Sequence, residues 1–145
     1  MNFWKAMKEW FLAIWTLPQT VLGLIVQLVT KAKPCKKWID GVGYDFYIAT
    51  RFNRYWSGVS LGDFIIFADE TCVGNNSIKH EYGHCIQSNY FGWFYLLIVG
   101  IPSVIGNLWD RVAHKDWTYT LRERWYYSRF PENMADKLGG VDRGF

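Results

Sequence analysis

Apolar residues recur at helical spacing through the first thirty residues of the chain. They are Phe3, Met7, Trp10, Phe11, Ile14, Val21, Leu22, Ile25, Leu28 and Val29. The spacing predicts a helix over residues 3–30, which Pro18 should kink or divide in two. A thin polar stripe follows the opposite face: Lys5, Glu9, Thr16, Thr20, Gly23, Gln27 and Thr30. This pattern fits a helix on a membrane surface, a span packed against a partner, or a soluble helix on a core.

Residues 43–69 change to short β-branched and aromatic runs separated by Gly, Ser, Asn and Asp. This pattern predicts two or three antiparallel strands, with turns near Asn53 and from Ser57-Gly58 to Gly62-Asp63. Asn76 or Ser77 then offers an N-cap for a helix over residues 77–90.

Residues 91–109 form an uncharged apolar segment that is just long enough to span a bilayer. Gly100 and Pro102 interrupt it near its middle. Residues 117–129 predict a helix with charged outer positions. A last short helix is opened by Pro131 and closed by Gly139-Gly140.

Together these elements predict a single α+β domain over residues 1–145. A short antiparallel sheet would be followed by the 77–90 helix and the C-terminal helices. Residues 1–36 would form an amphipathic or membrane-associated N-terminal helix. Residues 37–145 would form the core of the domain, including the apolar segment 91–109.

Composition narrows the class of partner. Aromatic residues make up 19% of the chain, which suits a core, an interface or a membrane–water boundary. The net charge of +3 is too small to favour nucleic acid. One basic cluster (Lys31, Lys33, Lys36 and Lys37) follows the first apolar stretch and suits anionic lipid headgroups. The three cysteines, Cys35, Cys72 and Cys85, fit no disulfide or zinc-knuckle spacing and indicate free thiols in a reducing compartment.

Residues 79–85 read K-H-E-Y-G-H-C and hold two of the three histidines. Positions four apart lie on one face of a helix, so His80 and His84 present two imidazoles to one point. A catalytic zinc binds three protein ligands and a water, whose pKa it lowers. Glu81 is placed to take the proton of that water as a general base. Gly83 is unfavourable inside a free helix, which indicates that another backbone approaches there.

A catalytic site requires a third ligand, and two downstream residues are candidates. His114 would complete a three-histidine site. Glu132 lies in P-E-N-M-A-D at the start of a predicted helix, with Asp136 one turn later on the same face. In that arrangement Glu132 binds the metal, and Asp136 accepts a hydrogen bond from a ligand histidine and fixes its tautomer. Glu132 alone is explained by the helix dipole, but its pairing with H-E-x-x-H favours the ligand role.

H-E-Y-G-H followed by E-N-M-A-D resembles the gluzincin group of zinc metallopeptidases, which includes thermolysin-like enzymes and integral-membrane CaaX-type proteases. The resemblance covers about a dozen residues of the chain. It implies a zincin-like fold and Zn²⁺ held by His80, His84 and Glu132. It also implies Glu81 as general base and Asp136 as the partner of His80.

The resemblance further implies an edge strand before the active helix, for which Phe64 to Ala68 is the candidate segment. Gluzincins also use a Tyr or His that steadies the oxyanion. Four residues compete for that role: Tyr119, Tyr126, Tyr127 and His114.

The expected ligands constrain the apolar segment 91–109, because His80 precedes it and Glu132 follows it. A single crossing would place the two about 30 Å apart. The segment should therefore be buried in a soluble core, or dip into the membrane and return near Gly100-Ile101-Pro102. We expect a membrane-associated domain on one leaflet, with its active site on the cytoplasmic side. Interfacial or core positions are expected for Trp4, Trp10, Trp15, Trp93 and Trp109.

Three functions are consistent with this pattern. The favoured one is zinc-dependent hydrolysis of peptide bonds in a peptide or protein substrate. The alternative is a non-catalytic zinc-binding, membrane-associated scaffold domain, in which metal joins residues 77–90 to 131–138. Glu81 argues against the scaffold, because a structural metal site needs no base. A small membrane-interaction protein with a chance motif explains the paired E-x-x-x-D least well.

Overall fold

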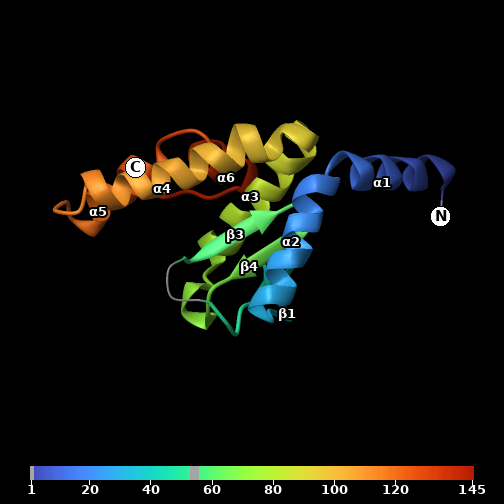
Figure 1. Ribbon diagram of the computed structural model, residues 1–145, viewed down its shortest axis with the longest axis horizontal. Helices are drawn as coiled ribbons and strands as arrows, with labels where there is room; N and C mark the ends of the chain where they lie inside the picture. Colours follow the sequence, from blue (N-terminus) through green and yellow to red (C-terminus); the bar gives the residue numbers. More distant parts are fainter. Residues whose placement is uncertain (1, 53–55) are drawn as a thin grey trace.

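The computed structural model describes residues 2–52 and 56–145 as an α+β fold, the class that the sequence predicts (Figure 1). Within these residues there are four strands and six α-helices, joined in places by short 3-10 and π segments. The helices are α1 (Phe3–Trp15), α2 (Leu17–Thr30), α3 (Asn75–Phe91), α4 (Ile101–Ala113), α5 (Tyr119–Tyr127) and α6 (Glu132–Gly139). The strands are β1 (Lys33–Ile39), β2 (Val42–Ile48), β3 (Gly58–Leu61) and β4 (Phe64–Phe67).

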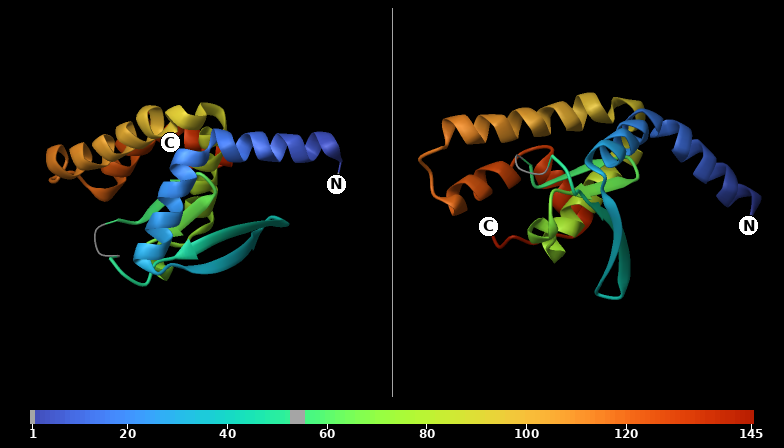
Figure 2. Two further views of the ribbon diagram at one scale, coloured as in Figure 1. Left: turned by 45° about the vertical axis from the view of Figure 1, so that its right-hand side comes forward. Right: turned by 60° about the horizontal axis from the view of Figure 1, so that its bottom comes forward.

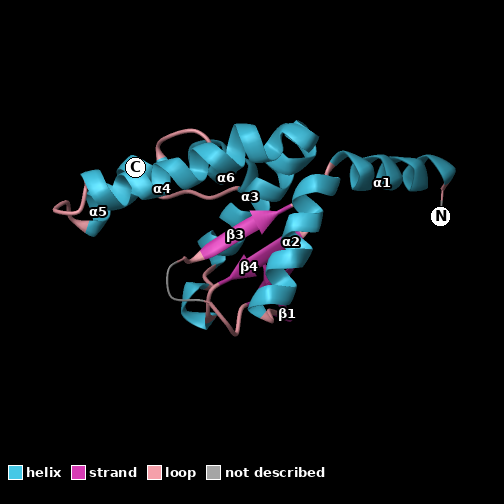
Figure 3. Cartoon of the chain, in the orientation of Figure 1, coloured by secondary structure: helices cyan, strands magenta, loops and turns pink. Residues whose placement is uncertain are grey.

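The sheet is mixed and has the strand order β1-β2-β4-β3. Figure 3 shows β3 beside β4 at one end of this order. The pairs β1–β2 and β3–β4 are antiparallel hairpins, whereas β2 and β4 run parallel. The expectation of an antiparallel sheet is therefore wrong at its centre, because the second hairpin joins the first through β4. For the same reason the segment Phe64 to Ala68 is not an edge strand. The edge next to α3 is formed by β3.

Strand β1 lies outside the region in which the sequence pattern predicts strands. Its lysines mask the alternation, but Ile39 at its end is buried and packs in the cluster that includes Phe46 and Ile78. The predicted Gly62-Asp63 turn joins β3 to β4, whereas Ser57-Gly58 leads directly into β3 instead of forming a turn. The turn predicted near Asn53 lies outside the described residues. Figure 2 shows the β1–β2 hairpin extending beyond the rest of the sheet.

The N-terminal helix is divided in two, as Pro18 predicts. Helices α1 and α2 meet at Thr16 with a bend of 71°, and Pro18 occupies the first turn of α2. Helix α1 projects away from the body of the molecule (Figures 1 and 2). The buried positions of helix α2 are Gln19, Gly23 and Thr30. Gly23 lies against the β3–β4 hairpin, Val26 packs on the cluster that includes Ile66, and Gln19 donates to Ser88 of α3 and to the Gly92 carbonyl.

The burial pattern of helix α2 is therefore the reverse of that in a soluble amphipathic helix, which buries its apolar face. Apart from Val26, its large apolar side chains are exposed: Leu17, Val21, Leu22, Leu24, Ile25, Leu28 and Val29. At Gly23 a Cβ would overlap the carbonyl oxygen of Leu61, so a small residue is required where α2 crosses β3. The expectation of a soluble helix buried on the core is wrong for this face.

Helix α3 begins two residues earlier than predicted, after Gly74, and no side chain caps it. The N-cap expected from Asn76 or Ser77 is therefore wrong. The buried face of α3 packs on α6 through two glycines. A Cβ at Gly83 would overlap the Ala135 carbonyl, and one at Gly139 would overlap that of Lys79. The close backbone approach predicted from Gly83 is confirmed.

The apolar segment 91–109 turns at residues 92–94 and then forms one continuous helical stretch, Leu96–Ala113, which includes α4. Gly100-Ile101-Pro102 is not a turning point, because Pro102 lies in the first turn of α4, where proline is tolerated. Only 11% of this stretch is buried, so it is not the core of the described fold. It carries an outward apolar stripe of Ile101, Val104, Ile105, Leu108, Trp109 and Val112.

The tryptophans expected at an interface or in a core differ in how exposed they are. Trp4, Trp10, Trp93 and Trp109 are exposed, so the expectation that they fill a core is wrong. Trp15 is half-buried and donates a hydrogen bond to the Asn89 carbonyl, and Trp93 donates one to the Ile14 carbonyl. These two bonds join the α1–α2 corner to the end of α3.

Candidate metal centre

Two histidines of α3 and one glutamate of α6 converge at a buried point. Glu132 Oε2 lies 3.0 Å from His80 Nε2 and 3.2 Å from His84 Nε2. One ligand atom from each of the three residues falls within 4.8 Å of the other two, and all three side chains are buried. The close packing of α3 on α6 through Gly83 produces this convergence, because it brings the start of α6 across the His80–His84 face. The structure thus brings together the three residues expected as ligands.

The hydrogen bonds on the far side of each imidazole leave its Nε2 turned toward the centre. His80 Nδ1 lies 2.6 Å from Asp136 Oδ1, and a carboxylate only accepts, so Nδ1–H donates. Gln87 Nε2 donates to the Pro131 carbonyl, which turns Gln87 Oε1 toward His84 Nδ1 at 2.7 Å. In the neutral tautomers that result, both Nε2 lone pairs face a carboxylate oxygen. Such a donor set is stable only with an added proton or a metal cation between the three atoms.

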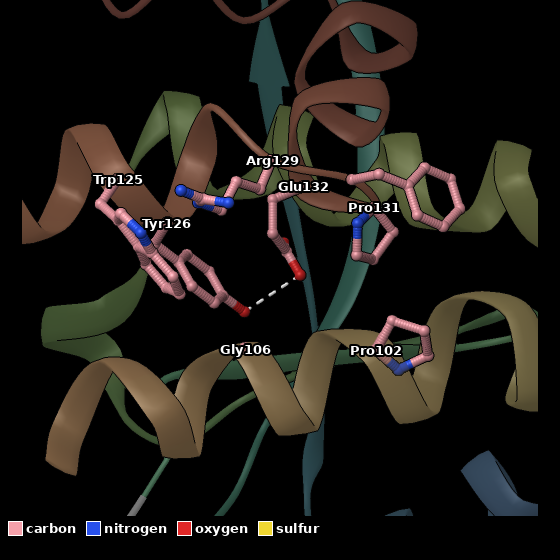
Figure 4. A pocket seen from close by; sticks show the side chains of 8 residues that line it. Pro102, Gly106, Trp125, Tyr126, Arg129, Pro131 and Glu132 are labelled. Carbon is pink, nitrogen blue, oxygen red and sulfur yellow. Dashed lines mark hydrogen bonds between the residues drawn. The ribbon is translucent and has the colours of Figure 1, made fainter. Parts of the chain in front are cut away.

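The second oxygen of Glu132 is held by two hydroxyl groups. Ser103 of α4 donates to Glu132 Oε1 at 2.5 Å. Tyr126 of α5 donates to the same oxygen at 3.0 Å (Figure 4). The two hydroxyls lie 3.3 Å apart. With Oε1 occupied in this way, Oε2 is the oxygen that faces the histidines. The apolar helix α4 therefore contributes directly to the position of a candidate metal ligand.

The charges around the centre favour a cation. Burial alone would lower the pKa of His80, but hydrogen bonds to Asp136 and Glu132 and the charge of Glu81 raise that pKa to about 9. Burial would raise the pKa of Glu132, yet its contacts with His80 and His84 hold it well below the ordinary range. Glu81 differs, because burial raises its pKa while His80 and His84 pull it down only in part. A carboxyl group with a raised pKa is suited to accept and return a proton.

Asp136 is fixed from its other side by Arg143 near the C-terminus. Arg143 Nε donates to Asp136 Oδ2 at 2.6 Å, and Nη2 donates to Oδ1 at 3.0 Å. The guanidinium also lies 3.4 Å from the ring centre of Tyr127, whose ring packs edge-on against His80. Burial would raise the pKa of Asp136, but hydrogen bonds from His80 and Arg143 outweigh it and lower that pKa. The Asp136–Arg143–Tyr127 contacts thus hold the His80 ring in place.

Glu81 lies on the adjacent side of α3 and faces strand β3. A Cβ built on Gly58 would lie 2.9 Å from Glu81 Oε1, so the first residue of the strand lies next to this carboxyl group. His80, Glu81, His84 and Glu132 all line one cleft of about 1290 Å³ that is walled by α2 and α4. The proposed base therefore faces the open side of the centre.

His114, the alternative third ligand, lies elsewhere. Its Nδ1 is 3.1 Å from Asp110 Oδ1, and its ring stacks on Trp117. Arg122 donates to Asp110 Oδ2 through both Nε and Nη2, which joins α5 to α4. This cluster stabilises the α4–α5 connection, and the structure does not place His114 with His80 and His84.

The four candidates for the oxyanion role do not all lie in the cleft. Tyr119, Tyr126 and Tyr127 line the cleft that holds Glu81, whereas His114 is not among its lining residues in the described part of the chain. Tyr126 already donates to Glu132 and Tyr127 packs on His80, so both support ligands. Burial raises the pKa of both phenols, which therefore stay protonated and able to donate.

Three residues of this centre escape detection in the sequence, because Gln87, Ser103 and Arg143 carry no motif of their own. Tyr126 is among the oxyanion candidates, but its support of Glu132 depends on the α4–α5 pairing. Gln87 had the strongest available signal, because it lies three residues after His84 on the same helix face.

Comparison with protein families gives no match, and neither the curated proteins nor the solved structures contain a significantly similar chain.

Proposed function

We propose that this protein is a zinc-dependent peptide hydrolase of gluzincin type, built as a small zincin-like domain. One observation carries the proposal: His80 Nε2, His84 Nε2 and Glu132 Oε2 converge on one point, with Glu81 beside it on the same cleft. Two imidazoles and one carboxylate are a typical ligand set for a catalytic zinc.

Each residue then has a distinct task in hydrolysis. Zinc, when bound by His80, His84 and Glu132, would polarise the substrate carbonyl and lower the pKa of the attacking water. Glu81 accepts one proton from that water while the water oxygen forms a bond to the carbonyl carbon. Glu81 then delivers the proton to the amide nitrogen as the C–N bond breaks, which gives a carboxylic acid and an amine. Asp136 and Gln87 keep the two ligand imidazoles in the tautomer that leaves Nε2 unprotonated.

A non-catalytic scaffold is less well supported by the packing. Helices α3 and α6 already contact each other closely through Gly83 and Gly139, so they have a direct interface without a metal bridge. A scaffold also leaves no task for Glu81, whose carboxyl group lines the cleft.

We further propose that the domain sits on, or dips into, one leaflet of a membrane on its cytoplasmic side. The outward apolar faces of α1, α2 and α4 support this, because monomeric soluble proteins rarely expose contiguous apolar patches of such extent. The stretch Leu96–Ala113 passes a length and hydropathy test for a membrane helix, and α1 with α2 passes it as a bent pair. Ser103 within Leu96–Ala113 contacts both Glu132 and Tyr126. A single crossing would therefore hold the centre and the charged helix α5 at bilayer depth, which is costly.

The substitution E81Q tests the catalytic part of the proposal. We expect the zinc-loaded parent to hydrolyse a mixture of unfolded proteins in detergent, with new N-termini detected by labelling and mass spectrometry. E81Q should bind zinc as the parent does and lose hydrolysis, because glutamine cannot carry the proton. Hydrolysis retained in E81Q would contradict the general-base role, and zinc binding without hydrolysis in the parent would favour the scaffold.

A further inference from the structure

The cleft above the candidate metal centre has unusual walls for a site in a soluble enzyme. Val29 of α2 and Val104 of α4 belong to its two walls, while His80, Glu81 and Glu132 lie at its floor. Both valines are more than half exposed, at 56% and 59%. The walls are therefore continuous with the apolar surface that α2 and α4 present outside the cleft, and an apolar chain could pass from that surface to the floor without crossing a polar barrier.

One side of the cleft offers backbone hydrogen bonds. The hairpin register pairs Leu61 with Phe64 and Val59 with Ile66, and the Ala68 amide donates to the Ser57 carbonyl. Alternate residues of a strand face opposite edges, so Gly58 and Ser60 face away from β4.

Within the described residues, the outer edge of β3 is only partly occupied. The Ser60 carbonyl accepts the Tyr95 hydroxyl at 2.9 Å, which agrees with its outward direction. The N–H and C=O groups of Gly58 and the N–H of Ser60 then face the cleft that both residues line. An extended peptide can pair with such an edge, which supplies affinity through its main chain. Gly58 also lies next to Glu81, so a chain paired there brings a peptide bond to the proposed base.

The cleft becomes polar toward the α4–α5 connection. Asp110 and Arg122, which are paired with each other, and Glu123 line this end. The α2 side is formed by four aliphatic residues and Thr30. A substrate that is apolar along one part and polar beyond it matches this gradient. A segment at the boundary between a membrane anchor and water has that composition.

We propose that the substrate is an extended, apolar polypeptide segment supplied by a membrane anchor, which pairs with β3 between the walls formed by α2 and α4. This inference rests on the proposed zinc hydrolase function, and it names the substrate class of that same cleft. The main chain gives the alignment with Glu81. The apolar side chains contact α2 and α4 and provide the selectivity.

Hydroxamates test this without knowledge of the cleaved sequence, because the hydroxamate group binds zinc directly. Affinities would be measured for the zinc-loaded protein in lipid nanodiscs by calorimetry. The probes are acetohydroxamate, an apolar Leu-Val-Phe-Leu hydroxamate, its N-methylated form, a Ser-Gly-Ser-Gly hydroxamate and dodecanohydroxamate. We expect the apolar peptide to bind about tenfold or more tightly than the Ser-Gly peptide. N-methylation should weaken the affinity of the apolar peptide about tenfold, because it blocks pairing with β3.

Two matched double variants locate the effect. V29S/V104S changes both cleft walls, and V21S/V112S changes exposed valines of the same two helices outside the cleft. The wall variant should bind the apolar peptide about tenfold more weakly, with its affinities for acetohydroxamate and zinc unchanged. The control variant should change none of these. Equal affinity for the apolar and Ser-Gly peptides, or an unaffected wall variant, would overturn the proposal.

The remaining outcomes are also decisive. Dodecanohydroxamate binding as tightly as the apolar peptide, with no effect of N-methylation, would identify a lipid acyl chain as the occupant and overturn the peptide assignment. Failure of the parent to bind zinc or acetohydroxamate would overturn the proposed function itself, whatever the state of the cleft walls.

Discussion

Gly83 of α3 lies so close to Ala135 of α6 that a Cβ at position 83 would overlap the Ala135 carbonyl. This contact sets the distance between the helix that carries His80 and His84 and the helix that carries Glu132. The glycine destabilises an isolated helix relative to alanine, but it allows the two backbones to meet and the three side chains to converge.

The substitution G83A should therefore separate α3 from α6. We expect a loss of about 2–4 kcal/mol in the free energy of unfolding, because the added methyl meets backbone and not a flexible side chain. Zinc affinity should fall in the same variant, since Glu132 moves with α6. Thermal unfolding and a zinc titration in detergent measure both effects.

Gly106 on α4 provides the matched control. A Cβ there would lie 3.7 Å from the Tyr126 ring, an ordinary contact distance. G106A should keep zinc affinity and raise stability by about 0.5–1 kcal/mol, because alanine is the better helix former. Equal behaviour of G83A and G106A would show that the α3–α6 approach does not set the site.

Ser103 and Tyr126 should control how Glu132 binds metal. Both hydroxyls occupy Oε1, so S103A/Y126F would free that oxygen to join the metal. We expect zinc affinity to fall about 10–100-fold, as for other groups that orient metal ligands. In the cobalt-substituted protein the visible absorption should weaken, because a second carboxylate oxygen raises the coordination number.

The exposed residues Ser128 and Tyr90 supply a control of the same chemistry. S128A/Y90F removes one hydroxyl of each kind away from Glu132 and should leave the cobalt spectrum and zinc affinity unchanged. An unaltered spectrum in S103A/Y126F would mean that the two hydroxyls stabilise the fold without orienting the ligand.

Membrane seating predicts a strong effect of charge on the outward face of α4. Val112 is 76% exposed at the end of the apolar stripe. V112K should keep the fold and reduce flotation with uncharged phosphatidylcholine vesicles about tenfold, because lysine is costly in an apolar phase and this lipid offers it no opposite charge. N76K, at an exposed polar position of α3, is the control. Equal flotation of both variants with the parent would exclude α4 from the membrane contact.

The metal-site motif could be predicted from sequence because its spacing is local. Two histidines four residues apart on a helix must share a face, and Glu132 and Asp136 share one for the same reason. In the structure Asp136 is hydrogen-bonded to His80. His114 is bonded to Asp110 and lies away from His80 and His84. Contacts such as Ser103 with Glu132 depend on the path of α4 across the site, which no local pattern records.

The sheet and helix α2 show where sequence patterns are insufficient. The period of α2 reveals an apolar and a polar face, but it does not say which face meets the protein. Gly23 and Gln19 face inward, and the aliphatic residues other than Val26 face outward. Similarly, the pattern in residues 43–69 identifies strands, but the parallel pairing of β2 with β4 results from long-range contacts.

The most direct test of this account is the zinc content of the purified protein beside E132A and H114A. We predict about one zinc per chain in the parent and in H114A, and loss or strong weakening of binding in E132A. Zinc retained undiminished without Glu132, or lost without His114, would contradict the three-ligand centre. A parent protein that binds no zinc would contradict the hydrolase proposal as a whole.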